Sequence, residues 1–256
     1  MLTAAQEAAA QYLFAARRAG RVGPRIDEAV RPATVDDAIA VQLRTAKLLA
    51  LPVGGWKCSV PTAARAVIAA PIFAPTIHHA SPCALLVTGT AARVEPEIAF
   101  AMARDLPPRA QPYTEAEVRA AVGAAHLALE LIGPRYADPK SVSYPELLAD
   151  FIANQGLYVG PALAAPWASN LEAFSVVVRA SGAVIRSAEG KHPDGHPLRP
   201  LVWLANYLAA RGDHLRAGQI VTTGSYDGII DVPVDAPLDV EFGALGRIAL
   251  MLKRLP

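Results

Sequence analysis

The run RVEPEI at residues 93–98 places two carboxylates in a stretch whose apolar residues are typical of a buried strand. Side chains alternate along a strand, so Glu95 and Glu97 are expected on one face, with Cα atoms roughly 6.5 Å apart. Two carboxylates at that separation repel each other unless positive charge lies between them. The pair therefore indicates either a cation site or a solvated face of a sheet.

A third carboxylate, Glu130, interrupts the apolar run HLALELI at residues 126–132. Glutamate is depleted in strands and is rarely buried alone. Together with Glu95 and Glu97, it suggests an all-oxygen site that suits Mg²⁺ or Mn²⁺, with positions open for water and substrate. The alternative is that Glu95 and Glu97 line a solvated face and Glu130 ends a surface helix.

Two further segments carry groups that could act on an anionic ligand. Lys57, within GGWKCSV, is a general acid or base with a lowered pKa, an anchor for a substrate carboxylate, or a lysine whose amine simply reaches water. The segment TTGSYDG at residues 222–228 either presents Thr223, Ser225 and backbone N–H groups to an anion or forms an ordinary turn.

The composition excludes several classes of protein. With 256 residues, 53% of them hydrophobic, the chain can bury a continuous core. A net charge of +1 without a basic block argues against nucleic acid as a partner. No apolar stretch reaches the ~20 residues of a membrane span, and no signal peptide is apparent, so we expect a soluble, cytoplasmic protein. Cys58 and Cys83 lack metal-binding spacing and are expected to be small core residues.

Two helices are expected at the N-terminus. Thr3 and Gln6 form a capping-box pattern that opens a helix running to about Arg18. Thr34 opens a second helix that runs to about Ala50. We therefore expect residues 1–51 to form a helical region packed on the main domain.

Short apolar runs broken by Pro and Gly follow, and they predict a β-rich catalytic domain over residues 52–256. Two helices interrupt the strands, one opened by a capping box at Thr114 and the other at residues 197–212. Strands and helices do not alternate strictly, which favours an α+β fold with a curved or barrel-like mixed sheet over a doubly wound parallel sheet.

Several motifs occur in an order that characterises one family: GWK, RVEPEIAF ending near RDLP, ALELIGPR, LADFIANQG, GHPLRPLVWLA and LRAGQIVTTGS. Over essentially its whole length the chain resembles the 2-hydroxypentadienoate (2-keto-4-pentenoate) hydratases and the related 4-oxalocrotonate decarboxylases of the fumarylacetoacetate hydrolase superfamily. The resemblance implies a mixed β-sheet roll with flanking helices and an N-terminal helical region, assembled into a homo-oligomer.

The resemblance also implies roles for individual residues. By motif position, Glu95 and Glu97 match the family's E-x-E metal ligands, Glu130 matches its third carboxylate ligand, and Lys57 matches the lysine of its G-x-K segment. The implied cofactor is Mg²⁺ or Mn²⁺.

The implied reaction is the hydration of a 2-hydroxy-2,4-dienoate to a 4-hydroxy-2-oxo acid, in the meta-cleavage breakdown of aromatic compounds. The metal stabilises enolate charge, and Lys57 holds the substrate carboxylate and helps to move a proton. Thr223, Ser225 and Ser187 are candidates to orient substrate or water.

The sequence departs from the family pattern near the lysine. The family has an acidic residue after an L-F-A-like segment, whereas the run at residues 72–75 of this chain ends in Pro75. His78 or His79 is expected to replace that acid, since imidazole titrates near neutral pH, or the two form a surface pair on a lid loop.

Other activities share the same motifs. A 2-oxo-dicarboxylate (4-oxalocrotonate-type) decarboxylase and an acylpyruvate C–C hydrolase use the same metal, lysine and enolate chemistry. A dicarboxylate substrate needs a second cation distal to the metal, for which Arg65, Arg135 and Lys191 are candidates. A non-catalytic partner subunit is an alternative of another class, because hydratase and decarboxylase relatives associate with each other.

Overall fold

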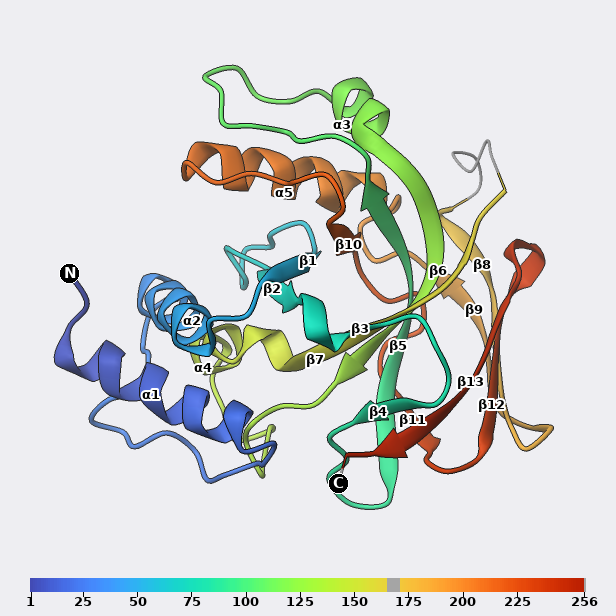
Figure 1. The fold of residues 1–256 in the computed structure, drawn as a ribbon, viewed down its shortest axis with the longest axis horizontal. Coiled ribbons are helices and arrows are strands. Elements are labelled where there is room, and N and C mark those ends of the chain that lie inside the picture. Colours follow the sequence, from blue (N-terminus) through green and yellow to red (C-terminus); the bar gives the residue numbers. More distant parts are fainter. Residues whose placement is uncertain (165–170, 256) are drawn as a thin grey trace.

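The strands expected beyond residue 52 form two mixed sheets in the computed structural model, which describes residues 1–164 and 171–255 (Figure 1). The first sheet has the order β2 (Ala69–Phe73), β1 (Val53–Cys58), β10 (Ile220–Thr222), β5 (Ala91–Met102), β6 (Val122–Ile132), β7 (Asn154–Ala162) and β3 (Ile77–His78), with β11 (Ile230–Pro233) paired to β5. The second has the order β4 (Cys83–Leu85), β13 (Arg247–Arg254), β12 (Pro237–Phe242), β8 (Ala173–Ala180) and β9 (Ala183–Lys191). Mixed sheets with flanking helices confirm the predicted α+β class.

The core lies between the two sheets. On β6, Leu127, Leu129 and Leu131 are buried in one cluster with Val240 of β12 and Ile248 of β13. Because side chains alternate along a strand, the residues between these leucines point to the opposite side of the first sheet. That opposite side carries the chemistry described below.

Close contact between the sheets requires a glycine at one position. Gly160 of β7 lies so near β13 that a Cβ added there would come within 2.6 Å of Ile248 Cγ1. A larger residue at position 160 would push the sheets apart or displace the isoleucine, so the glycine allows the roll to close here.

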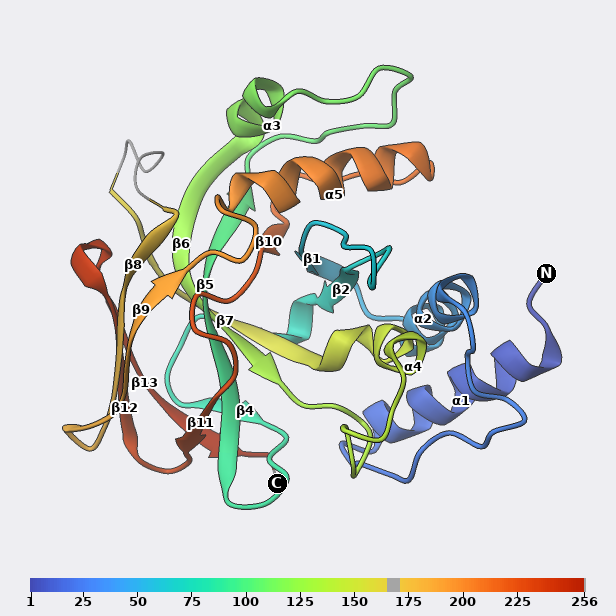
Figure 2. The same ribbon diagram turned by 180° about the vertical axis from the view of Figure 1, so that it is seen from behind.

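Three helices gather at one end of the molecule, as Figures 1 and 2 show. They are α1 (Ala4–Arg18), α2 (Val35–Leu49) and α4 (Tyr144–Ala149). The capping boxes at Thr3 and Thr34 are both formed. Leu13 of α1, Val41 of α2 and Leu148 of α4 belong to one buried cluster, so the N-terminal helices share a core with a segment of the β-rich part. The predicted boundary at residue 51 falls in the connection between α2 and β1.

The remaining helices lie beside each other near the end of β5 and the start of β6 (Figure 1). They are α3 (Glu115–Ala121), opened by the expected capping box at Thr114, and α5 (Leu198–Ala210). Short 3₁₀ turns occur at Ala74–Thr76, Phe151–Ala153 and Gly243–Leu245. Cys58 and Cys83 are buried and unpaired with each other, as expected. Within the described ranges, none of the helices combines the length and apolarity needed to cross a membrane.

Candidate active site

The pairing of β5 with β6 brings the three predicted carboxylates together. Glu95 lies directly opposite Glu130 in the antiparallel register, and Glu97 follows two residues along on the same face of β5. One oxygen from each of the three side chains lies within 4.8 Å of the others. Glu97 and Glu130 are buried, so the alternative of a solvated face does not hold.

Lys57 reaches this cluster from β1. Its Nζ atom is 2.6 Å from Glu130 Oε1 and donates a hydrogen bond of 3.3 Å to the carbonyl of Ile152. Asn154 Nδ2 donates to the same Glu130 oxygen at 2.9 Å. Glu130 Oε1 therefore has two donors, one of them charged.

The other oxygen of Glu130 has no such partner. Oε2 is buried and has no hydrogen-bond donor anywhere in the described residues. A buried carboxylate oxygen without a donor is costly, and a cation is the partner that would compensate it. With the oxygens of Glu95 and Glu97 converging on the same place, the donor set fits a hard divalent cation such as Mg²⁺ or Mn²⁺.

Glu97 is oriented from the side of β10. Its Oε2 atom accepts hydrogen bonds from the hydroxyl of Thr222 and, at 2.9 Å, from the backbone N–H of Gly224. The parallel pairing of β1 with β10 sets Thr222 opposite Lys57, and β10 in turn pairs with β5. Strands β1, β10 and β5 thus fix the positions of Lys57, Thr222 and the β5 carboxylates relative to one another.

Burial and mutual repulsion disfavour the ionised forms of the carboxylates in this cluster. Burial and the negative charge of Glu130 raise the pKa of Glu95 from 4.5 to about 7. Burial and the charges of Glu130 and Glu95 raise the pKa of Glu97 to about 8. A bound divalent cation would favour the ionised forms and reverse both shifts.

The pKa of Lys57, in contrast, is shifted in the direction that favours its charged form. Burial by itself lowers the pKa of its ammonium group, but the charges of Glu130, Glu95 and Glu97 outweigh burial and raise that pKa. The amine therefore stays protonated near neutral pH. This direction favours an anchor for a substrate carboxylate over the alternative of a base with a lowered pKa.

The cluster opens into a cavity of about 770 Å³. Arg65, Arg93, Lys140 and Ser225 line it, together with Lys57 and the carboxylates. Positive groups around a carboxylate cluster suit a ligand that is itself an acid, and the volume is within the range of small-molecule sites.

Of the hydroxyl candidates, only Ser225 lines this cavity, where its Oγ donates to the carbonyl of Gly228 at 3.1 Å. Thr223 is buried and donates to the carbonyl of Ile98 at 3.4 Å, so its hydroxyl points away from the carboxylates. Ser187 lies exposed on β9 and outside the lining.

The remaining candidates are also divided by the fold. His78 belongs to β3 at the edge of the first sheet, and neither it nor His79 is among the residues that line the cavity. Of the three candidate distal cations, Arg65 lines the cavity, whereas Arg135 is buried elsewhere and Lys191 ends β9.

Sequence reasoning missed Asn154 and Thr222, although both occur in motifs that carry the family resemblance. Asn154 begins β7 and contacts Glu130 from across the sheet, and Thr222 precedes the threonine that was singled out. Neighbouring residues of a strand point to opposite faces, so Thr222 and Thr223 cannot both face the carboxylates. This alternation could have indicated Thr222 as the other candidate.

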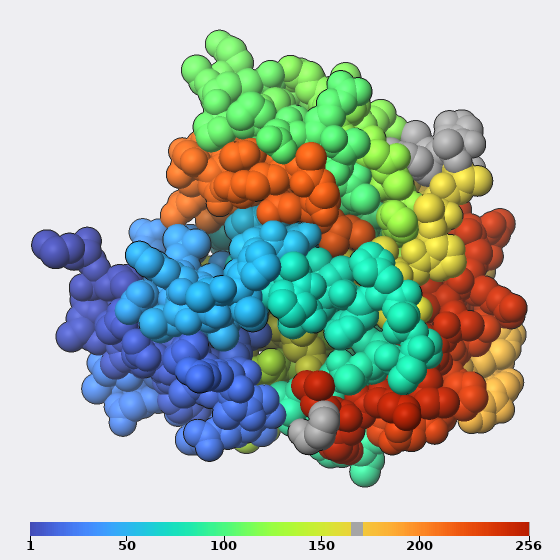
Figure 3. Space-filling view, viewed as in Figure 1, coloured from blue at the N-terminus to red at the C-terminus, as the bar shows by residue number. Residues whose placement is uncertain are grey.

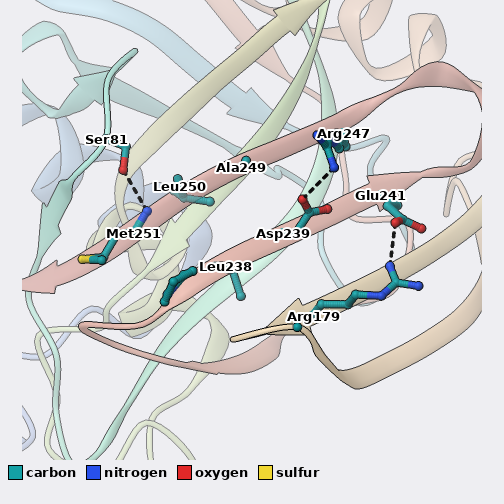
Figure 4. Close-up of a pocket in the computed structure, with 11 residues that line it drawn as sticks. Ser81, Arg179, Leu238, Asp239, Glu241, Arg247, Ala249, Leu250 and Met251 are labelled. Atoms are coloured by element: carbon teal, nitrogen blue, oxygen red, sulfur yellow. Dashed lines mark hydrogen bonds and ion pairs between the residues drawn. The ribbon is translucent and has the colours of Figure 1, made fainter.

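A second hollow, of about 510 Å³, lies on the second sheet (Figure 4). Its charged groups pair with one another. Arg179 Nη1 is 2.6 Å from Glu241 Oε1, and Arg247 Nη1 is 3.4 Å from Asp239 Oδ2. These charges are cross-strand pairs rather than convergent ligands, so the carboxylate cavity is the stronger candidate for an active site.

The chain is similar to known proteins over nearly its whole length. No protein-family model matches the chain. The 2-keto-4-pentenoate hydratase of Paraburkholderia xenovorans (strain LB400) is 28% identical over 95% of this chain and 93% of its own length.

Among solved structures, 4-oxalocrotonate decarboxylase from Pseudomonas putida G7, complexed with magnesium and adipate, superposes with a TM-score of 0.77. Its identity is 21%, covering 100% of this chain and 99% of that one. A putative fumarylacetoacetate hydrolase family protein from Yersinia pestis CO92 has a TM-score of 0.54 and 16% identity, covering 80% of this chain and 94% of that one. The chain is therefore similar in sequence to 2-keto-4-pentenoate hydratases, and it shares its fold with 4-oxalocrotonate decarboxylase and with proteins of the fumarylacetoacetate hydrolase family.

Proposed function

We propose that this chain is a divalent-metal-dependent hydratase that adds water to a 2-hydroxy-2,4-dienoate, giving a 4-hydroxy-2-oxo acid. The observation that carries the proposal is the buried carboxylate cluster, with Glu130 Oε2 lacking a donor and Lys57 beside it. The similarity to hydratases over nearly the whole chain supports the same reaction class.

In this proposal, Glu95, Glu97 and Glu130 hold Mg²⁺ or Mn²⁺. The cation supplies Lewis-acid stabilisation of the negative charge that develops on the substrate when the dienol becomes a ketone. Hydrogen bonds from Thr222 and the N–H of Gly224 orient Glu97 and favour its ionised form, and Asn154 holds Glu130 in place.

Lys57 acts on the substrate directly. Its protonated amine pairs with the substrate carboxylate. As the dienol becomes an α,β-unsaturated ketone, the amine gives one proton to the substrate carbon and takes up the proton released by the enol hydroxyl, so its charge is restored. Water then adds to the conjugated double bond, and Ser225 is the hydroxyl placed to orient water or substrate. Thr223, Ser187 and His78 lie outside the cavity, and we assign them no step.

We further propose that the enzyme works as a cytoplasmic homo-oligomer in the breakdown of aromatic compounds. We propose that it acts on a small 2-oxo or 2-hydroxy-dienoate acid and that it associates with another enzyme of the same pathway.

Decarboxylation of a 2-oxo-dicarboxylate is the second candidate, and the cavity lining is the observation that favours it. Arg65, Arg93 and Lys140 offer cations beyond Lys57 for a second carboxylate. Arg93 is partly engaged by Asp231, at 3.7 Å, which leaves Arg65 and Lys140 as the stronger candidates.

A substrate comparison separates the two activities. The enzyme loaded with Mg²⁺ or Mn²⁺ is offered 2-hydroxypenta-2,4-dienoate and 4-oxalocrotonate in parallel, with consumption followed by ultraviolet absorbance and products weighed by mass spectrometry. A hydratase yields a product heavier than the dienoate by one water. Release of carbon dioxide from 4-oxalocrotonate, without hydration of the dienoate, would replace the proposal with a decarboxylase.

A further inference from the structure

The segment between α4 and β7 has an unusual backbone. Phe151, Ile152 and Ala153 have φ angles of 56°, 54° and 58°, so three consecutive residues that carry a Cβ adopt the left-handed conformation. Side chains disfavour this conformation, and such segments persist only where their surroundings hold them. We call residues 151–153 the left-handed turn.

The left-handed turn and the residue that follows it contact the two members of the buried ion pair between Lys57 and Glu130. The carbonyl of Ile152 accepts the hydrogen bond from Lys57 Nζ at 3.3 Å. Asn154, the next residue after the turn, donates from Nδ2 to Glu130 Oε1 at 2.9 Å. If the turn relaxed to an ordinary backbone conformation, the lysine and the carboxylate would each lose a partner.

Arg17, near the end of α1, donates hydrogen bonds to the residues on both sides of this turn. Its Nη2 atom donates to Asp150 Oδ1 at 2.7 Å and to the carbonyl of Asp150 at 2.8 Å, on the residue before the turn. Its Nη1 atom donates to the carbonyl of Asn154 at 3.1 Å, on the residue after it. The guanidinium carbon also lies 4.4 Å from the centre of the Phe151 ring.

The side chains that make these hydrogen bonds are buried. The side chain of Arg17 is 8% exposed and that of Asp150 is fully buried. The second carboxylate oxygen of Asp150 accepts from the backbone N–H of Arg135 at 2.7 Å, so the aspartate is itself fixed. A planar guanidinium with several donors can bridge Asp150 and Asn154 at once, which a lysine ammonium would do poorly.

From these contacts we propose that Arg17 is a positioning residue for the active site. Acting through Asp150 and Asn154, it holds the left-handed turn in the conformation that aims one carbonyl at Lys57 and one amide at Glu130. The N-terminal helical region thereby contributes to the geometry of a metal and substrate site that it does not touch. The Mn²⁺-affinity and activity readouts below rest on the proposed function, whereas the hydrogen–deuterium exchange readout does not.

The test compares Arg17→Met with two controls from the same helical region. Arg18→Met removes a neighbouring exposed charge, and Arg44→Met removes the ion pair with Glu7, which joins α2 to α1 without contacting the turn. Each full-length variant is measured by hydrogen–deuterium exchange of peptides covering residues 150–158, by Mn²⁺ affinity from electron paramagnetic resonance, and by kcat and KM.

Arg17→Met is expected to exchange faster at residues 150–158 and to bind Mn²⁺ more weakly. It should also lose roughly 3-fold to 10-fold in kcat, less than the roughly 10-fold to 100-fold that follows removal of a group bonded directly to a metal ligand. Both control variants should match the wild type within about 2-fold in Mn²⁺ affinity and kcat, a margin well below that range. Should Arg17→Met fail to fold, Arg17→Lys keeps the charge and is expected to show the same changes to a smaller degree.

A rescue experiment separates positioning from general stability. Ala153→Gly lowers the intrinsic cost of the left-handed conformation, so in the Arg17→Met background it should restore part of the lost Mn²⁺ affinity and kcat. Unchanged exchange and Mn²⁺ affinity in Arg17→Met, equal losses in Arg44→Met, or absence of rescue would overturn the proposal. If the wild type fails to hydrate the dienoate, the proposed function fails, and exchange still decides the role of Arg17.

Discussion

Replacing Thr222 with valine is expected to weaken metal binding in a pH-dependent way. The Thr222 hydroxyl is buried and donates to Glu97 Oε2, which also accepts from the N–H of Gly224. Valine has the same shape but no donor. The substitution therefore removes one hydrogen bond to the ionised form of Glu97 and leaves the other.

The size of the effect follows from the pKa of Glu97. A hydrogen bond to a charged group contributes about 1.5–3 kcal/mol, and because the Gly224 bond remains we take the lower value, which corresponds to about one pKa unit. With a pKa of about 8, Glu97 is ionised in roughly one molecule in ten at pH 7, and a further unit leaves roughly one in a hundred. Mn²⁺ affinity should fall about 10-fold at pH 7 and only about 3-fold at pH 8.5, where the proton competes less.

The assay is a Mn²⁺ titration followed by electron paramagnetic resonance of the free ion at both pH values. Thr223→Val is the matched control, because that hydroxyl is equally buried but donates to the carbonyl of Ile98. Equal affinity of Thr222→Val and wild type at pH 7 would refute the reasoning. The same would follow from an equal loss in Thr223→Val.

Three further predictions concern charge at the site. Because the pKa values of Glu95 and Glu97 are raised, the folded, metal-free chain binds more protons than the unfolded chain between about pH 4.5 and pH 8. Its stability should therefore fall as pH rises through that window. A Tm in chelator that increases from pH 5 to pH 8 would contradict this. Mn²⁺ at about 100 times its Kd should add about 2.7 kcal/mol of stability at pH 8, seen as a higher Tm, and no shift would count against the cation site. Lys57→Met leaves Glu130 with one donor fewer in a buried site, so denaturant unfolding should show a loss of about 3–5 kcal/mol, with turnover abolished; an active, equally stable variant would exclude the anchoring role.

The parts of the fold that could be predicted from the sequence are those governed by local chemistry. The capping boxes at Thr3 and Thr114 open helices where expected, because the cap side chains bond to backbone groups only three residues away. Strand β2 could not be predicted from local pattern, because Pro71 interrupts its apolar run. The strand tolerates proline because it lies at an edge of the first sheet, where one side makes no ladder hydrogen bonds.

In the candidate site, too, only the features governed by local pattern could be predicted from the sequence. Alternation on β5 predicts that Glu95 and Glu97 share a face, and the isolation of Glu130 among apolar residues makes it a candidate site residue. The register that sets Glu95 opposite Glu130 depends on strand pairing between distant segments. The roles of Asn154 and Arg17 depend on contacts across 24 residues to Glu130 and 133 residues to Asp150, for which no local pattern exists.

The N-terminal helices illustrate why a boundary drawn from sequence carries limited meaning. Residue 51 lies in the connection between α2 and β1, where helix gives way to strand. A boundary there does not indicate that α1 and α2 share a buried cluster with α4, or that a side chain of α1 reaches the segment beside the carboxylates. Packing specificity of this kind arises from tertiary structure, which overrides local pattern.

We propose that a divalent cation held by the carboxylate cluster makes this chain a hydratase. The most direct test measures Mg²⁺- or Mn²⁺-dependent loss of 2-hydroxypenta-2,4-dienoate absorbance for wild type and Glu97→Gln, with Mn²⁺ binding measured on the same samples and Glu189→Gln, on the exposed β9, as the control. The account predicts a product heavier by one water, no turnover without metal, and loss of both turnover and tight Mn²⁺ binding in Glu97→Gln alone. Turnover that survives chelation, or a Glu97→Gln variant that hydrates the dienoate as the wild type does, would contradict it.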